Sequence, residues 1–429
     1  MTMKNKLRKL VEENIATDSG STRKLTIKGE TKPYKVYRFP LNACYYNDAN
    51  GRIATYISEY IANGNTLDKE NLEQYNGVLE EFVYASNKKA LDNTKNNISR
   101  IGQRVAGVVL DDGRILDGNR RFTALRKINR EEGKDVYFEA VLLDGSHGLT
   151  QRDIKQLELN LQHAEERPLE YDPIDNLVDV YRDLIENTLF TEVEYAENTN
   201  KSKSDVTLLM KKASLMVQFL QFINAEGKFY IARDLALDGP LQEMVRILEG
   251  HIKGIDVRTV GESHPNKREL ADYIQLRNTL FASLLSKRKL AGDEKSSDLT
   301  REVREIGQFI VKTANRQEFL EEMEEVVEDI YETFKEQEKV DAKTIATVGK
   351  ELSEVREKAQ NVIENFVEDG RIGVAKAKPI QSLNKVYKEL DGIRIDQVKR
   401  MDAPTEAEFL KVYEEVQQKF EEIRKAINV

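Results

Sequence analysis

The segment DDGRILDGNRRFTALRKINR, residues 111–130, concentrates residue types that bind anions. Arg114–Arg130 contains six basic residues and one acid, although the whole chain is acidic. Gly118 stands at the predicted start of a helix, where unpaired amides and the helix dipole attract anions and a missing side chain lets a phosphate reach the backbone. Arg120 and Arg121 add bidentate donors that suit a triphosphate. The residues predicted to contact a polyphosphate are Gly118, Asn119, Arg120, Arg121 and Thr123.

A purely structural interpretation of the two arginines is also open. Arg120 and Arg121 can be solvated residues of an amphipathic helix that buries Phe122, Leu125 and Ile128. Basic residues in the first turn of a helix are repelled by the positive end of the helix dipole, however, so their presence there needs an explanation. Phosphate binding supplies that reason, and the two interpretations stand side by side at this point.

The surrounding pattern predicts the elements that position this segment. Runs rich in Tyr, Val and alternating apolar residues indicate strands, and Asp112-Gly113 is a strong signal for a hairpin turn. The order strand, turn, strand, helix, strand is typical of an α+β unit, which we expect over residues 1–150. The predicted elements are strands over 25–29, 34–41 and 135–145, a hairpin over 106–118, and helices over 52–64 and 120–133.

Beyond residue 150 the pattern is helical. Residues 151–225 include a helix that Asp172 can cap, then a short helix, a polar turn at Asn198–Ser202 and a longer helix with basic residues near its start. This is the outline of a helix-turn-helix and predicts a DNA-binding region. Residues 226–429 are expected to form an α-helical assembly or dimerisation region, because two segments of this region carry heptad-like apolar spacing. Those segments are too short for a long coiled coil and favour a helical bundle or a dimer seam.

Composition limits the classes of protein to consider. The chain has 429 residues, a net charge of −9 and 40% hydrophobic residues, enough for two or three folded units. A single cysteine, Cys44, excludes an intramolecular disulfide and fits a reducing cytoplasm. No apolar run predicts a membrane span, and no zinc or P-loop motif occurs. The acidity argues against non-specific coating of nucleic acid but allows DNA binding through one local basic surface.

Three segments together resemble the ParB (chromosome and plasmid partition) family. DGNRRFTA (117–124) resembles the arginine box typically written G-E-R-R-x-R-A. Residues 157–186 are similar to the A-L-I-E-N-L-Q-R box and the helix that follows it, and residues 201–215 are similar to the family's helix-turn-helix. The three matches occur in the family's order over about residues 30–225. The resemblance implies a ParB/sulfiredoxin-like α+β domain, then a helix-turn-helix, then a mainly α-helical C-terminal region.

The resemblance also implies a function. The first box of the family grips the triphosphate of a nucleotide, usually CTP, and the second helps to hold the phosphates and Mg²⁺; nucleotide binding closes a dimeric clamp on double-stranded DNA. Carried over by position, Asn160 and Gln162 join the nucleotide site, with Asn160 as the metal ligand. The residues expected at the DNA are Lys201, Ser202, Lys203, Ser204, Thr207, Lys211 and Lys212.

The chain departs from the family pattern at several positions, which leaves hydrolysis of the nucleotide, as a weak CTPase, an open question. Asn119 and Leu159 stand where the family has acids, and Thr123 and His163 stand where it has arginines. Two alternatives are therefore carried forward. One is an enzyme on the same fold, a nuclease or small-molecule kinase whose metal carboxylates would come from Asp111, Asp112 and Asp117. The other is a helical scaffold with a vestigial nucleotide pocket and protein partners for its C-terminal region.

Overall fold

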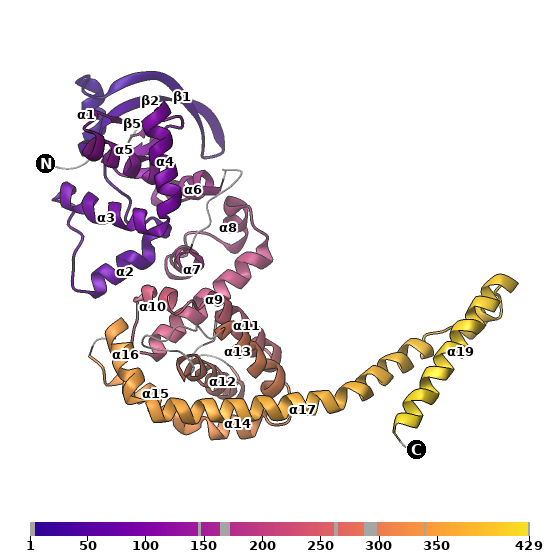
Figure 1. Ribbon diagram of the computed structural model, residues 1–429. Helices are drawn as coiled ribbons and strands as arrows, with labels where there is room; N and C mark the ends of the chain where they lie inside the picture. Colours follow the sequence, from indigo (N-terminus) through magenta and orange to yellow (C-terminus); the bar gives the residue numbers. More distant parts are fainter. Residues whose placement is uncertain are drawn as a thin grey trace. The chain divides into compact units, whose positions relative to one another are not determined.

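The structure is a computed structural model that describes residues 5–144, 147–163, 172–260, 265–286, 298–338 and 340–427. Its internal contacts group the chain into two compact units, Met1–Asn365 and Phe366–Val429. Among the described residues, no helix is both long and apolar enough to cross a membrane. The fold is α+β, with a five-stranded mixed sheet near the N-terminus followed by a mostly helical region (Figure 1).

The sheet has the strand order β1-β2-β5-β3-β4. β3 and β5 run parallel, and the other neighbouring strands are antiparallel. The chain passes from β4 through helix α5 to β5, so the crossover begins at the end of β4 and leaves Gly118 between strand and helix. The strands predicted over 34–41 and 135–145, the hairpin and the helix ending at Gly133 are confirmed, whereas the strand predicted over 25–29 is the end of a longer strand that begins at Thr17 and stops at Ile27. Their observed bounds are β1 (Thr17–Ile27), β2 (Glu30–Pro40), β3 (Gly107–Leu110), β4 (Ile115–Asp117), α5 (Asn119–Glu132) and β5 (Tyr137–Leu143).

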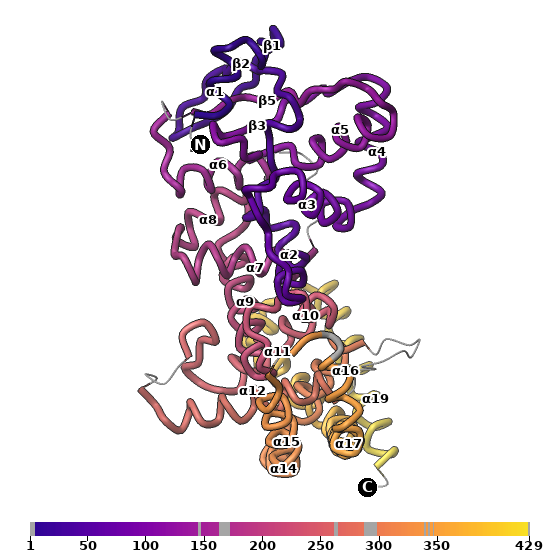
Figure 2. The backbone as a smooth tube through the Cα atoms, turned by 90° about the vertical axis from the view of Figure 1, so that its left-hand side faces the viewer, coloured from indigo at the N-terminus to yellow at the C-terminus, as the bar shows by residue number. Residues whose placement is uncertain are grey.

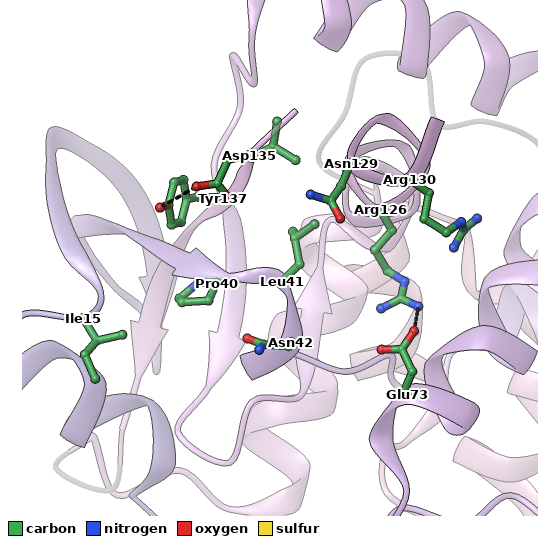
Figure 3. Close-up of a pocket in the computed structure, with 11 residues that line it drawn as sticks. Ile15, Pro40, Leu41, Asn42, Glu73, Arg126, Asn129, Arg130, Asp135 and Tyr137 are labelled. Atoms are coloured by element: carbon green, nitrogen blue, oxygen red, sulfur yellow. Dashed lines mark hydrogen bonds and ion pairs between the residues drawn. The ribbon is translucent and has the colours of Figure 1, made fainter. Parts of the chain in front are cut away.

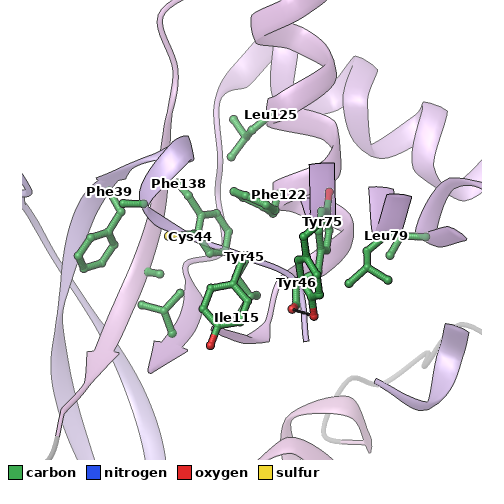
Figure 4. Close-up of a cluster of buried hydrophobic side chains, with 14 of the residues drawn as sticks. Phe39, Cys44, Tyr45, Tyr46, Tyr75, Leu79, Ile115, Phe122, Leu125 and Phe138 are labelled. Atoms are coloured by element: carbon green, nitrogen blue, oxygen red, sulfur yellow. Dashed lines mark hydrogen bonds between the residues drawn. The ribbon is translucent and has the colours of Figure 1, made fainter. Parts of the chain in front are cut away.

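Both faces of the sheet are covered, because successive side chains of a strand point to opposite sides. Val109 of β3 belongs to one buried cluster, while its neighbours Val108 and Leu110 belong to another. The first cluster lies under α5 and centres on Phe122, whose ring meets those of Tyr46 and Phe138 edge-on at centroid distances of 5.0 and 5.5 Å (Figure 4). The second cluster packs against α6 (Gln151–His163). Figure 2 shows α6 and α5 on opposite sides of β3.

Three helices between β2 and β3 complete the α5 side of the domain. The predicted helix over 52–64 is observed as the short η2 (Gly51–Ile53) and α2 (Ala54–Ala62). Sequence analysis assigned no element between residues 65 and 105, yet this stretch forms α3 (Leu72–Ser86) and α4 (Lys88–Ile101). Both contact α5. An ion cluster ties α3 to α5, because the buried Glu80 carboxylate accepts hydrogen bonds from the Arg126 and Arg130 guanidiniums.

The described helices between residue 150 and Asn365 belong to the same compact unit as the sheet. Asp172 caps α7 (Pro173–Val180) as predicted, accepting a hydrogen bond from the amide of Ile174. α6 packs on β4 and β1, and α7 packs on η2 and α2. The remaining helices of this unit are the π-helical η4 (Tyr181–Glu186), α8 (Glu192–Thr199), α9 (Lys203–Phe222), α10 (Phe229–Asp234), α11 (Asp238–His251), α12 (Lys267–Ser286), α13 (Leu299–Glu305), the π-helical η5 (Ile306–Val311), α14 (Arg316–Glu322), α15 (Glu324–Lys335) and α16 (Ala342–Glu351), with α1 (Lys6–Glu12) and the 3₁₀ turn η1 (Leu41–Ala43) at the N-terminal end.

The second unit is helical and keeps much of its apolar surface outside. It comprises the end of the long α17 (Ser353–Asp391), the short α18 (Ile395–Val398) and α19 (Ala403–Ala426). Tyr413 and Phe420, two residues of the heptad-like pattern, have exposures of 52% and 38%. An apolar stripe that is exposed within its own unit is what a dimer seam requires. Dimerisation through it stays a prediction.

Replacing Gly118 by alanine should destabilise the fold by about 2–4 kcal/mol, because two costs combine. Gly118 has a φ of 107°, and an added Cβ would lie 2.9 Å from Cζ of Phe138. Gly133→Ala is the matched control: its φ is 62°, but nothing lies within 4 Å of the added Cβ, so it should cost about 1 kcal/mol. Urea unfolding of both variants measures the difference. Equal losses would show that contact with Phe138 contributes nothing.

Candidate anion-binding site

A small cavity lies where β4 ends and α5 begins. Its volume is about 80 Å³. Five separated stretches of chain meet around it: η2, the end of α3, the end of β4, the first turn of α5 and the end of α6. The described residues that line it are Asn50, Arg52, Ile53, Val83, Ser86, Leu116, Asp117, Gly118, Asn119, Arg120, Arg121, Leu161 and Gln162.

The start of α5 is shaped by glycine. Gly118 is the residue before the helix, and its missing Cβ leaves room for the Phe138 ring and for the backbone of Gly107. Among the described residues no side chain caps this helix, and its first turn contains no acid. The dipole of the helix therefore presents positive potential to the cavity, and no carboxylate in the first turn of the helix offsets it.

Guanidinium groups dominate the charge of the cavity wall. Three arginines, Arg52, Arg120 and Arg121, line it together with one carboxylate, Asp117. Asp117 Oδ2 accepts hydrogen bonds from Arg121 Nη2 at 3.0 Å and from Arg23 Nη1 at 2.7 Å. Asp117 thus fixes the orientation of Arg121. Guanidiniums form charge-assisted hydrogen bonds to anion oxygens, so this lining suits an anionic ligand.

Buried polar atoms at the cavity also lack partners. Within the described part of the chain, Arg121 Nε and Asn119 Oδ1 are buried and have no hydrogen-bond partner. Leaving a buried donor unsatisfied costs about 1–3 kcal/mol, so such atoms in native proteins call for a ligand or a water. An anion oxygen can accept from Arg121 Nε. The observation supports an anion at this place.

The structure gathers part of the predicted nucleotide site. Gly118, Asn119, Arg120, Arg121 and Gln162 line the cavity together. Thr123 does not: it is fully buried, and its hydroxyl is bonded to Tyr46 Oη at 2.7 Å and to the carbonyl of Asn119 at 2.9 Å. Asn160 is also outside the set of lining residues. Residues two apart on an α-helix point about 200° apart, so Asn160 and Gln162 cannot face the same cavity.

Asn50 and Arg52 are two polar members of the site that the sequence did not predict, and Ser86 is a third. Arg52 lies on η2 and Asn50 caps it, more than sixty residues before the arginine box, and no motif marks them. Their placement depends on carboxylates of α7. An added Cβ at Gly51 would meet Asp179 Oδ2 at 1.6 Å, so this carboxylate lies directly on the η2 backbone. One turn earlier on α7, Asp175 Oδ1 accepts the amide of Thr55 at 2.9 Å.

A buried charge cluster stands behind this contact, between α6 and α7. Lys155 Nζ lies 3.7 Å from Asp179, 3.4 Å from Asp183 and 4.0 Å from Glu158. Burial acts to lower the pKa of Lys155, and the surrounding carboxylates outweigh it and hold that pKa well above its ordinary value. Burial raises the pKa of Glu158 to about 7 and that of Asp183 to about 6. The ammonium of Lys155 occupies the place among these carboxylates that a bound cation would take.

The remaining carboxylates do not fit a metal site. Asp111 Oδ1 accepts the amide of Arg8, and Asp112 Oδ2 accepts the hydroxyl of Tyr45. Asp117 is held by two guanidiniums, and Glu158 faces Lys155. Over the residues that the structure describes, no group of three or more His, Cys, Asp or Glu can hold a metal ion. Each of these described carboxylates therefore already has a donor or a cation as its partner.

A second cavity, of about 430 Å³, lies on the same domain near the other end of α5 (Figure 3). Two arginines line it, but their charges are already used. Arg126 bonds to Glu80 and Glu73, and Arg130 bonds to Glu80. The cavity beside Gly118 differs in that its guanidiniums lie next to the start of a helix, where backbone amides also attract anions. The smaller cavity is the stronger candidate for binding an anion.

The two helices of the predicted DNA-binding region are present. α8 and α9 are joined through Asn200, whose φ of 52° turns the chain. Ser202 caps α9 in a capping box with Asp205, and its hydroxyl lies 2.8 Å from that of Ser204. Lys203 and Ser204 are exposed and Lys201 is half-buried. These residues form an accessible first turn.

Residues further along α9 face the protein interior instead. The hydroxyl of Thr207 donates to Glu192 Oε2 at 2.8 Å, and Lys211 Nζ donates to Glu249 Oε2 at 2.6 Å. Lys212 is buried and paired with Asp238. Helix α9 packs against α11 and α7, which explains why these basic residues have internal partners. In this structure Lys211 and Lys212 do not offer their charges to DNA.

Comparison with known proteins gives no family assignment: no family model, no curated protein and no solved structure matches this chain. The case for the site therefore rests on its own geometry.

Asp175 makes the stability of the protein depend on pH. Burial raises its pKa to about 7, above the value of about 3.9 expected in the unfolded chain. The folded state holds a proton that the unfolded state has released, so the free energy of unfolding falls as pH rises from about 4 to about 7. Asp175→Asn should remove this penalty and stabilise the protein more at pH 8 than at pH 5, by on the order of 2 kcal/mol. Thermal unfolding at both pH values checks it, and an equal change at both would contradict it.

Proposed function

We propose that this protein binds the polyphosphate of a nucleoside triphosphate, CTP or another, in the cavity beside Gly118. The observation that carries the proposal is the meeting of three guanidiniums with the start of α5. Helix amides, the helix dipole and bidentate arginines are the groups that bind phosphate in proteins. The partnerless Arg121 Nε supplies a further donor. The proposal concerns binding and assigns no hydrolysis.

We further propose that the domain is of ParB type. Two features support this class: the arginine box lies at the strand-to-helix turn where a phosphate grip is needed, and Gln162 of the second box lines the same cavity. In this proposal Mg²⁺ is carried by the phosphates of the nucleotide, because the protein carboxylates nearby are paired with cations.

DNA is the proposed second ligand, approached by the first turn of α9. Lys201, Lys203 and Ser204 are accessible there, and early residues of a recognition helix are the ones that reach the major groove. The exposed apolar stripe of α19 supports a homodimer, with other protein partners as the alternative. Together these features describe a dimeric, nucleotide-responsive DNA-binding protein.

The nucleotide site is tested by calorimetric titration of the full chain with CTP, ATP, GTP and UTP in the presence of magnesium. The double variant Arg120→Ala, Arg121→Ala should weaken binding by 100-fold or more, because each charge-assisted hydrogen bond to the ligand is worth about 1.5–3 kcal/mol. Arg104→Ala is the matched control, since Arg104 is an exposed arginine of the same domain outside the cavity. Binding that survives in the double variant, or that fails in the parent protein, would sink the proposal.

The DNA surface is tested through salt dependence. For a mixed-sequence duplex, Lys201→Ala with Lys203→Ala should reduce the slope of log K against log salt by about 0.9 for each phosphate that the variant no longer neutralises. Lys211→Ala is the control: it breaks the pair with Glu249 and should lower the melting temperature while leaving the slope unchanged. Fluorescence anisotropy at several salt concentrations measures both. An unchanged slope in the double variant would exclude this turn from the DNA interface.

A further inference from the structure

We infer that the outward side of helix α4 (Lys88–Ile101) is a second surface for double-stranded DNA, suited to lie in the major groove. In taking DNA as the ligand, the inference rests on the proposed function. It concerns a different element from α9, however, and does not need the nucleotide site. The residues that form this surface, named the α4 face, are Lys89, Asn93, Asn96, Asn97 and Arg100.

The α4 face is one continuous strip of helix surface. Successive residues of an α-helix turn by about 100°, and this places the five side chains within an arc of about 100°. All five are exposed, and the buried Leu91 points to the opposite side of the helix. Helix α4 packs on α5 and α3. In Figure 2 it lies at the outer edge of the sheet domain, with α5 between it and the strands.

The positive charge of the α4 face is not paired within the described chain. The side chains of Lys89 and Arg100 make no ion pair or hydrogen bond with any residue that the structure describes. Lys95, on another side of the helix, pairs with Glu131 of α5. The one acid of α4, Asp92, is half-buried and lies outside the arc of the face. The face therefore complements DNA, which carries one negative charge per about 1.7 Å of its axis.

Lys89 stands where the helix by itself favours an acid. It lies in the first turn of α4, and this turn contains no acid. The positive end of the helix dipole repels a lysine there, whereas an acid would be attracted. A phosphate partner explains the choice of residue, because both the lysine and the start of the helix attract it.

Three asparagines inside the helix also need an explanation. Asparagine ranks well below alanine in helix propensity, because its side chain competes for the hydrogen bonds of the backbone. Asn87 has a structural role, since its side chain caps α4 by accepting the amide of Ala90 at 3.0 Å. The side chains of Asn93, Asn96 and Asn97 make no hydrogen bond with a described residue. A side-chain amide is, however, the group that pairs bidentately with adenine in the major groove.

The dimensions of α4 fit that groove. An α-helix with its side chains is about 10–12 Å across, and the major groove of B-DNA is about 12 Å wide. Lys89 and Arg100 are separated by about 17 Å along the helix axis, which corresponds to about five base pairs at 3.4 Å each. The cations at the two ends of the strip can contact phosphates while the amides between them meet base edges.

The charges of the α4 face are tested by fluorescence anisotropy of the full chain with a mixed-sequence duplex at several salt concentrations. Lys89→Ala with Arg100→Ala should reduce the slope of log K against log salt by about 0.9–1.8, since each lost phosphate contact contributes about 0.9. Lys32→Ala with Lys134→Ala is the matched control. Both are exposed lysines of the same domain that already pair with neighbouring glutamates, so the slope should stay unchanged.

The amides are tested by selecting binding sites for the full chain from a pool of random duplexes. The triple variant Asn93→Ala, Asn96→Ala, Asn97→Ala should bind the selected duplex at least about tenfold more weakly, because the bidentate contacts to adenine are lost. Its affinity for the mixed-sequence duplex should change by less than about twofold. Its melting temperature should not fall, because alanine favours the helix, and this separates lost contacts from unfolding.

Three results overturn the inference while leaving the proposed function in place. The first is an unchanged salt slope in the Lys89, Arg100 variant when Lys201→Ala with Lys203→Ala reduces the slope. The second is full affinity of the asparagine variant for the selected duplex. The third is binding of single-stranded RNA of the same sequence at least about tenfold tighter than the duplex, lost in the Lys89, Arg100 variant. Absence of duplex binding by the parent protein overturns both the inference and the proposed DNA-binding function.

Discussion

The contact of the Phe138 ring with two glycines is the constraint on which the candidate site depends. Cβ atoms added at Gly107 and Gly118 would lie 2.3 and 2.9 Å from Cζ of Phe138. The ring therefore occupies space that no other residue type at these two positions would leave. On its other side it meets Phe122, which meets Tyr46. This aromatic chain fixes the first turns of α5 against β5, and so fixes where Arg120 and Arg121 stand.

Positive and negative side chains gather in different places around these aromatic residues, although the net charge of the chain is −9. On the α5 side, arginines dominate the small cavity, whereas in the larger one the Glu80 carboxylate offsets Arg126 and Arg130. Behind the cavity, between α6 and α7, carboxylates gather around one lysine. The two charge systems touch at Gly51, where Asp179 lies on the backbone that leads to Arg52. A displacement of α7 would therefore also displace η2, which forms one wall of the cavity beside Gly118.

The same packing decides what the helical region can present to a partner. Helix α9 buries Val206, Leu215 and Phe219, and its later lysines are consumed by ion pairs with α11. Its first turn is exposed. In the second unit the balance is reversed, since the apolar residues of α19 stay exposed. An accessible polar turn and an uncovered apolar stripe are different kinds of surface and suit different kinds of partner.

Local features of the fold could be predicted from the amino-acid sequence. Period-two alternation and the Asp112-Gly113 turn located the strands, Asp172 marked the start of α7, and Gly133 marked the end of α5, because each depends on neighbours in the chain. It also placed Gly118, Arg120 and Arg121 together at a helix start. The weakly patterned stretch between residues 65 and 105 gave no such signal, and α3 and α4 there were not predicted. Their helical state is stabilised by packing on α5.

Which side chains complete the site depends on contacts between segments that are distant in the sequence. Thr123 lies within the arginine box, but the helix turns its hydroxyl to Tyr46 and away from the cavity. Of the second box, Gln162 reaches the cavity and Asn160 does not, because two residues span more than half a helical turn. Arg52 lines the cavity because the neighbouring Gly51 packs against Asp179, a residue 128 positions further along the chain (179 less 51). Burial and ion pairing between distant segments do not appear in local sequence patterns, and they determine which basic residues line the cavity and which have internal partners.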